Sequence, residues 1–291
     1  NALGRRRRGL AKAYAFYLGK LKLVFISIAF LLILVSSKFL AENYYHKPIF
    51  LALLAGALYL AFVNLTGFLI TLLQSVNYFK GLFYKELFFQ ILRLFIVPLA
   101  VLFSLKVSLS SSLLTFLIIF SLALAWFFTL IFTFFIVRRN VAFLKVKKGS
   151  LVKRERKKIN KFLLAMSATV FSGVVFGYID KVMLGHFVQA EFLGYYHAAL
   201  SLVGAAIPLI SFRVALLPIF SRLKENQLEI GFRRSAKWTL VIAIIGIFCI
   251  LPIAPWVIRI VYGSAYLQAT NLLRLFSLLL ISGSLGAIYS I

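Results

Sequence analysis

The chain has 291 residues, of which 63% are hydrophobic, and its mean hydropathy is +1.00. Soluble globular domains are about 45 to 50% apolar, so this composition excludes a soluble domain. A net charge of +26 suits nucleic acid only when a folded soluble surface carries it. The loops between the apolar segments are too short to form such a surface, and we therefore expect a membrane protein with no nucleic-acid partner.

Eight apolar segments follow one another along the chain, each long enough to cross the hydrocarbon core as a helix of about 20 residues. They are predicted at 17–39, 48–74, 82–105, 108–137, 162–187, 192–219, 238–260 and 266–291. The sequence thus predicts an all-α polytopic membrane protein with about eight transmembrane helices. No Met opens the chain and its last residue lies inside an apolar run, so we expect a fragment of a longer protein.

Of the 33 Lys and Arg residues, 25 lie in four clusters, around the start of the first segment and in or beside every second loop. The four clusters run from Arg5 to Lys22, from Lys80 to Lys85, from Arg138 to Lys161 and from Arg222 to Lys237. Because Lys and Arg accumulate in cytoplasmic loops, we expect these loops to be cytoplasmic and the protein to lie in the cytoplasmic (inner) membrane. Membrane lipids with anionic headgroups are expected partners of the clusters.

The longest basic stretch divides the segments four and four. It predicts three parts, namely a remnant of an N-terminal bundle at 1–140, a basic cytoplasmic linker at 141–161 and a remnant of a C-terminal bundle at 162–291. The charged flanks and spacing of the first two segments match those of the last two. This match indicates a parallel repeat about an axis along the membrane normal, with one helical hairpin missing ahead of the fragment.

Ionisable residues inside the apolar segments are the candidate binding residues, because a charge in hydrocarbon must be paired or face water. Arg93 lies near the middle of 82–105, and Gln90, three residues earlier, lies on the same helical face. Together they can donate hydrogen bonds to an anionic group. The alternative is a structural Arg93 that pairs with backbone carbonyls beside a kink at Pro98.

Asp180 is the one acidic residue that does not lie in or beside a loop. It is set in the apolar segment 162–187 and is the candidate for ion or proton coupling. It lies towards the outer end of that segment, so an interfacial anchor is the alternative. Lys181 and Arg274 are further candidates for lining a cavity, although both can reach the membrane surface. Arg213 is a weaker case of the same kind.

Catalytic and metal-binding patterns are nearly absent. The other six acids lie in or beside loops, and the single cysteine, Cys249, lies inside an apolar segment. We therefore expect no catalytic residues, no metal site and no cofactor.

Four motifs make the second half of the chain distinctive. They read Tyr178-Ile-Asp180-Lys181, Gly194-Tyr195-Tyr196-His-Ala198-Ala199, Pro218-Ile-Phe-Ser221-Arg222-Leu223 and Pro255-Trp256 followed by Tyr262-Gly263-Ser-Ala-Tyr266. This order resembles the polysaccharide flippases, the O-antigen and lipid-linked oligosaccharide exporters of the MATE-like superfamily. The resemblance implies two pseudo-symmetric bundles around a central cavity that opens alternately to each side, with this chain holding helices three to ten.

The same resemblance implies a substrate and its site. Family members hold the diphosphate of a polyprenyl-linked sugar with cationic cavity residues, and ion or proton antiport is thought to drive transport. The positions that suit substrate binding are Arg93 with Gln90, Lys181 and Arg274. Asp180 lies in a matching motif and suits ion or proton coupling. Polysaccharide-assembly proteins are expected as further partners.

The resulting hypothesis is a flippase for a lipid-linked oligosaccharide rather than an enzyme. A multidrug exporter of the same superfamily is one alternative, although more acids than cations would be expected within its spans. A membrane glycosyltransferase or polysaccharide polymerase is the alternative from another class, and such enzymes usually carry acidic or His- and Arg-rich outer loops.

Overall fold

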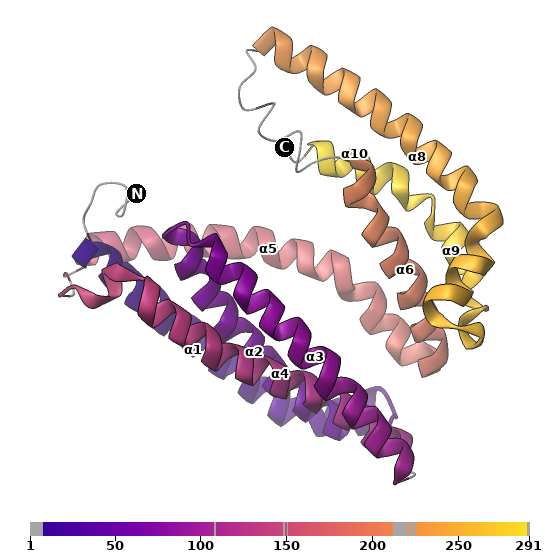
Figure 1. Ribbon diagram of the computed structural model, residues 1–291, viewed down its shortest axis with the longest axis horizontal. Coiled ribbons are helices and arrows are strands. Elements are labelled where there is room, and N and C mark those ends of the chain that lie inside the picture. The colour runs from indigo at the N-terminus through magenta and orange to yellow at the C-terminus, as the bar shows by residue number, and fades with distance from the viewer. Residues whose placement is uncertain are drawn as a thin grey trace. The chain divides into compact units, whose positions relative to one another are not determined.

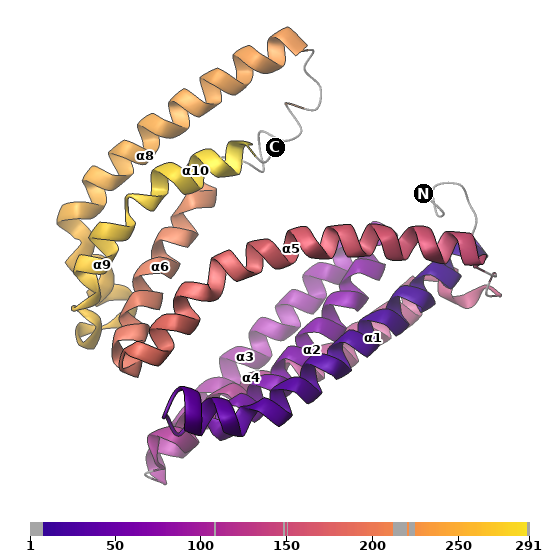
Figure 2. The ribbon, with the colours of Figure 1, turned by 180° about the vertical axis from the view of Figure 1, so that it is seen from behind.

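The computed structural model describes residues 8–107, 109–147, 149, 151–211, 220 and 225–289. Within these residues all regular secondary structure is helical (Figures 1 and 2). The elements are α1 (Arg8–Phe39), the π-helical turn η1 (Leu40–Tyr44), α2 (Phe50–Ser75), α3 (Phe79–Lys106), α4 (Ser111–Asn140), the 3₁₀ turn η2 (Ala142–Lys145), α5 (Lys153–Phe187), α6 (Ala190–Ser211), α8 (Glu225–Tyr262), the 3₁₀ turn η3 (Ser264–Tyr266), α9 (Ala269–Phe276) and α10 (Leu279–Tyr289).

Seven helices in the described part of the chain are long and apolar enough to cross a membrane. The pair α9 and α10 makes an eighth crossing if the two count as one span. The prediction of an all-α polytopic membrane protein is therefore confirmed. The pseudo-symmetry of two bundles stays a prediction.

The predicted segment 266–291 differs from one straight helix, because α9 and α10 meet at an angle of 44°. The Ser277 hydroxyl donates to the Arg274 carbonyl at 2.6 Å, and the Leu280 amide bonds to Ser277 three residues back. Serine side chains that bond their own backbone compete with the helical ladder, and i→i+3 bonds tighten it. The break thus follows from local hydrogen bonding at Ser277.

Several helices extend beyond their apolar segments. α1 begins at Arg8 and α5 at Lys153, each nine residues ahead of the predicted span. Lys, Arg and Glu are good helix formers, so a helix need not end where the hydrocarbon ends. The predicted linker 141–161 accordingly contains η2 and the first turns of α5. Arg213, like the rest of 212–219, lies outside the described residues.

Large apolar side chains cover the helix surfaces, and small ones fill the contacts between helices. Val35 is 81% exposed and Ile260 is 80% exposed, whereas alanine, serine and threonine dominate the buried set. Membrane helices approach one another through such small residues, since lipid accepts the large ones. Buried Thr129 and Thr133 donate to carbonyls one turn back at 2.7 and 2.6 Å, so these hydroxyls need no further partner. The protein is a multi-pass membrane protein.

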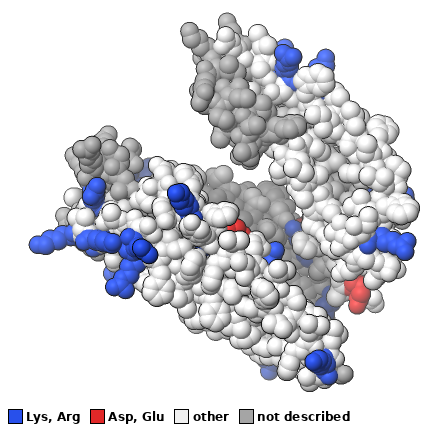
Figure 3. All heavy atoms as spheres, viewed as in Figure 1, with Lys and Arg blue, Asp and Glu red and all other residues white. Residues whose placement is uncertain are grey.

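The chain forms two compact units, residues 1–177 and 178–291. In the first, α1 to α4 lie side by side, and α2 packs most extensively against α4 (Figures 1 and 2). The start of α1 and the ends of α2 and α4 share one apolar cluster, which includes Ala11, Leu73 and Val141. Lys and Arg gather at this end of the unit (Figure 3), as expected for alternate loops on the same side of a membrane. The predicted boundary at 141–161 stays a prediction.

In the second unit, α6, α8, α9 and α10 pack around a core that includes Ala199, Ala243 and Leu280. At the turn after α8, the Tyr262 and Tyr266 rings stack with centroids 5.4 Å apart. Gly263 between them has φ +88° and ψ 174°. Only glycine adopts this backbone region readily, so the backbone of the turn requires the glycine of the Tyr-Gly-Ser-Ala-Tyr motif.

Replacing Gly263 with alanine is expected to destabilise the protein by about 1 to 3 kcal/mol, because a Cβ strains that conformation. Thermal unfolding of the purified protein in detergent measures the change. Gly286→Ala in α10 is the matched control, since an added Cβ there meets nothing within 4 Å. It is expected to be neutral or stabilising, because alanine is the better helix former. Equal losses in both variants would contradict the backbone argument.

Candidate functional site

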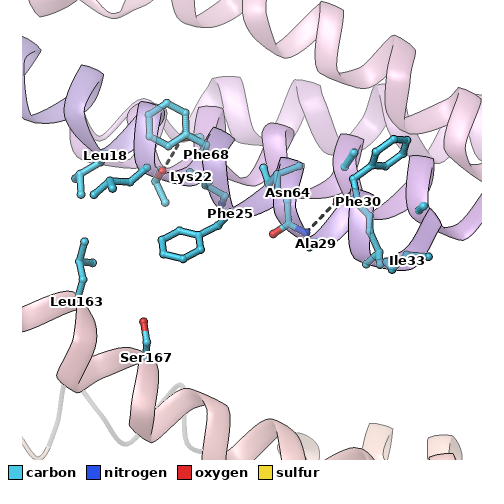
Figure 4. A pocket seen from close by; sticks show the side chains of 16 residues that line it. Leu18, Lys22, Phe25, Ala29, Phe30, Ile33, Asn64, Phe68, Leu163 and Ser167 are labelled. Carbon is cyan, nitrogen blue, oxygen red and sulfur yellow. Dashed lines mark hydrogen bonds between the residues drawn. The ribbon is translucent and has the colours of Figure 1, made fainter. Parts of the chain in front are cut away.

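A cavity of about 710 Å³ lies in the first unit between α1, α2 and the first half of α5 (Figure 4). Its size falls within the roughly 300 to 1,000 Å³ of ligand sites. Leu163 and Ser167 point into it from α5, opposite Phe25 of α1. Most of its lining is apolar, and the polar side chains are those of Lys22, Asn64, Thr71 and Ser167.

Lys22 is the one charged residue among the described residues that line this cavity. It lies 14 residues into α1 and is partly buried. Its Nζ reaches α2, where a Cβ added to Gly67 would be 3.8 Å away. Among the residues that the structure describes, Lys22 has neither a hydrogen bond nor an ion pair. A lone ammonium within a membrane helix requires water or an anion, so the cavity has the chemistry to hold an anionic group.

The cavity is charged at one end and apolar at the other. Five residues ahead of Lys22 on α1, outside the cavity lining, the Tyr17 hydroxyl donates to Asn160 Oδ1 at 2.8 Å, and the Arg156 guanidinium lies 5.8 Å from the Tyr17 ring centroid. This is the basic end of the unit. From Lys22 the lining runs along α1 to Ile33, about 16 Å at 1.5 Å per residue, and is almost wholly apolar there. A ligand with an anionic head and an apolar tail matches both ends.

Sequence reasoning missed Lys22, because it grouped this residue with the cytoplasmic cluster ahead of the first segment. The available signal was its spacing. Leu18, Lys22, Ile26 and Ala29 recur every three or four residues and therefore share a helical face.

The predicted pair Gln90 and Arg93 lies on α3, and neither residue lines this cavity. Gln90 Nε2 donates to Glu86 Oε1 at 2.7 Å, and Lys85 Nζ pairs with Glu86 Oε2 at 2.7 Å. Gln90 therefore uses its amide donor within the helix. Arg93, one turn further on, remains exposed, with its guanidinium 5.8 Å from the Phe89 ring centroid.

Lys85 is the most buried cation that the structure describes, at 5% exposure. Its Nζ lies 5.2 Å from the Trp126 ring centroid of α4, a cation–π geometry that adds to the Glu86 pair. Sequence reasoning placed Lys85 in a loop cluster. The structure places it in the contact between α3 and α4, where it holds these helices together.

Asp180 lies on α5 at the start of the second unit, and Tyr196 of α6 donates its hydroxyl to Asp180 Oδ2. The Tyr196 ring meets Phe276 of α9 edge to face, with centroids 5.0 Å apart. Asp180 Oδ1 is buried and has no hydrogen-bond partner among the described residues. A carboxylate with one bonded and one open oxygen can take up a proton or a cation. Sequence reasoning found Asp180 but missed its partner Tyr196.

Lys181 follows Asp180 in the sequence, and its ammonium contacts the Tyr178 ring. Its Nζ lies 4.5 Å from the Tyr178 ring centroid, three residues earlier on the same helix. This cation–π contact, beside the charge of the neighbouring Asp180, suits an ammonium near the membrane surface.

Arg274 of α9 donates from Nε to the Leu251 carbonyl of α8 at 2.9 Å. In a regular helix that carbonyl accepts the amide four residues later, but residue 255 is proline and has no amide hydrogen. Arg274 therefore satisfies the carbonyl that Pro255 leaves open. This contact joins α9 to α8 and gives Arg274 a structural role.

The five predicted site residues divide between the units. Gln90 and Arg93 lie in the first, whereas Asp180, Lys181 and Arg274 lie in the second. Within the described ranges no three His, Cys, Asp or Glu side chains group closely enough to hold a metal ion.

Comparison with protein families finds one described as "Polysaccharide biosynthesis protein", which matches residues 12–271. Comparisons with curated proteins and with solved structures give no match. The family match covers most of the chain and includes the cavity, the Asp180 motif and the turn at Gly263. The chain therefore belongs to this family of membrane proteins of polysaccharide synthesis or export.

Proposed function

We propose that the protein is a flippase that moves a polyprenyl-diphosphate-linked oligosaccharide across the cytoplasmic membrane by alternating access. Its basic loops face the cytoplasm in this proposal. The observation that carries it is the cavity of the first unit, with Lys22, which has no ion-pair partner among the described residues, toward the basic end and apolar walls beyond it. A diphosphate can bind the ammonium while the polyprenyl chain lies along the apolar walls.

The same cavity favours this function over the alternatives. A multidrug exporter that takes cationic drugs would have to overcome repulsion by Lys22. A glycosyltransferase or polymerase needs a catalytic carboxylate or histidine near its sugar, and neither residue type occurs among the described residues that line this cavity. We therefore propose transport rather than catalysis, with exposed Arg93 as a second contact along the substrate's path.

We propose that the Asp180–Tyr196 pair couples transport to a proton or Na⁺ gradient. Support comes from Asp180 Oδ1, a buried oxygen that makes no hydrogen bond among the described residues and can accept a proton or cation while Oδ2 stays bonded to Tyr196. Phe276 packs on Tyr196, so a change at this pair can move α6 against α9.

The pool of lipid-linked oligosaccharide after deletion of the full-length gene tests the function. A flippase predicts complete units trapped on the cytoplasmic face. Incomplete units would instead indicate a glycosyltransferase, and an unchanged pool with new drug sensitivity would indicate drug export.

Asp180→Asn is expected to remove the dependence of transport on an ion gradient, because a neutral amide cannot exchange a proton. Transport into proteoliposomes, measured with and without a pH or Na⁺ gradient, checks this. Glu191→Gln, an exposed carboxylate at the start of α6, is the matched control and should retain the full gradient response. A gradient response that survives in Asp180→Asn would overturn the coupling proposal.

A further inference from the structure

A second hollow, distinct from the cavity, lies on another face of α1 and is named here the α1–α4 groove. It has a volume of about 1310 Å³ and is lined by residues of α1, α2, α4 and η2. On α1, Gly19 and Leu23 line the groove, whereas Phe25 and Ile26 line the cavity. Phe68 of α2 lines both hollows, and the other described lining residues of the groove do not line the cavity.

Four cations line the groove at its basic end, and no acid appears among its described lining residues. They are Lys20, Arg138, Arg139 and Lys145. Lys145 Nζ donates to the Arg139 carbonyl at 3.2 Å, which fixes η2 against the end of α4. The side chains of Arg138 and Arg139 are exposed.

Beyond the cations the groove is apolar and continues along α4. Phe134 and Phe135 line it, and both also line an adjoining hollow of about 480 Å³. That hollow adds Leu130 and Ile131, and Lys22 of the cavity also reaches it from α1. From Arg139 to Leu130 the distance along α4 is about 14 Å at 1.5 Å per residue. An acyl chain can therefore lie on this track while its headgroup meets the arginines.

We propose that the α1–α4 groove binds an anionic phospholipid of the leaflet at the basic end. Its headgroup phosphate lies between Lys20 and the two arginines, and an acyl chain lies along Phe134 and Phe135. A free phosphate would contact only the cations, and a zwitterionic lipid would contact mainly the apolar track. An anionic phospholipid contacts both. Basic pockets between membrane helices on the cytoplasmic side have this chemistry.

Native mass spectrometry of the full chain in detergent, with phosphatidylglycerol or phosphatidylcholine added, tests the proposal. Wild-type protein should retain phosphatidylglycerol in preference. R138Q/R139Q should weaken the affinity for phosphatidylglycerol about 30-fold, because each neutralised cation costs about 5-fold in affinity and two are removed. K153Q/R154Q removes the same two charges from exposed positions at the start of α5 that do not line the groove, and should bind as wild type does.

Equal losses in the two double variants would overturn the proposal, because diffuse charge would then explain binding. Unchanged retention in R138Q/R139Q would overturn it too. Two competitors distinguish other sources of the same chemistry. Displacement by glycerol 3-phosphate at equal concentration would reduce the site to a phosphate site, and preferential displacement by a polyprenyl phosphate would make it a second substrate site. Failure of both competitors supports a bilayer lipid, whatever the substrate of transport.

Discussion

Lys22→Ala is expected to lower flipping of a polyprenyl-diphosphate-linked sugar by roughly 10- to 100-fold. The reason is the loss of the only charge that the described cavity walls offer to the diphosphate. A hydrogen bond to a charged group contributes about 1.5 to 3 kcal/mol, and each 1.4 kcal/mol corresponds to a factor of ten. The measurement is translocation of the lipid-linked sugar in proteoliposomes that contain equal amounts of folded protein.

Lys38→Ala is the matched control for this variant. Lys38 lies in the last turn of the same helix, is exposed and does not line the cavity, so its loss should leave flipping unchanged. Lys22→Arg keeps the charge and should retain most activity. If the Lys22→Ala variant flips the lipid-linked sugar at the wild-type rate, the substrate does not bind in this cavity. The family membership does not depend on this result.

Hydropathy was sufficient to predict seven membrane spans in the described part of the chain, whereas the eighth, 266–291, is bent. Runs such as 48–74 are apolar on all sides, and lipid accepts that surface without any specific partner. The ends of helices were less predictable, because the basic start of α5 is a good helix former outside the membrane. The bend at Ser277 depends on which carbonyl its hydroxyl finds, and composition does not reveal that choice.

The candidate site was predictable only where a residue conflicts with its surroundings. Asp180 was found because a carboxylate in an apolar segment requires a partner, but that partner, Tyr196, resembles any other interfacial tyrosine. Lys22 escaped notice because a lysine near a basic cluster resembles an orientation signal. Gln90 and Arg93 share a face as predicted, yet Glu86 on that same face binds Gln90. Pairings between nearby helical turns therefore decide which polar groups remain open to a ligand.

Arg274→Leu is expected to destabilise the second unit by about 1.5 to 3 kcal/mol, because the Leu251 carbonyl loses its charged donor. Unfolding of the full chain in mild detergent measures the loss. The structural explanation also predicts a rescue. In a Pro255→Ala background the new amide of residue 255 can bond to Leu251, so Arg274→Leu should cost less than half as much there.

Pro252→Ala is the control for this cycle. It restores an amide to the same helix, but that amide serves the carbonyl of Phe248 rather than that of Leu251. Arg274→Leu should therefore keep its full cost in the Pro252→Ala background. Equal costs in all three backgrounds would show that Arg274 stabilises the unit through another contact. A loss of flipping without a loss of stability would return Arg274 to the substrate-binding role that its sequence position first suggested, because a guanidinium needed by the fold cannot be removed without weakening it.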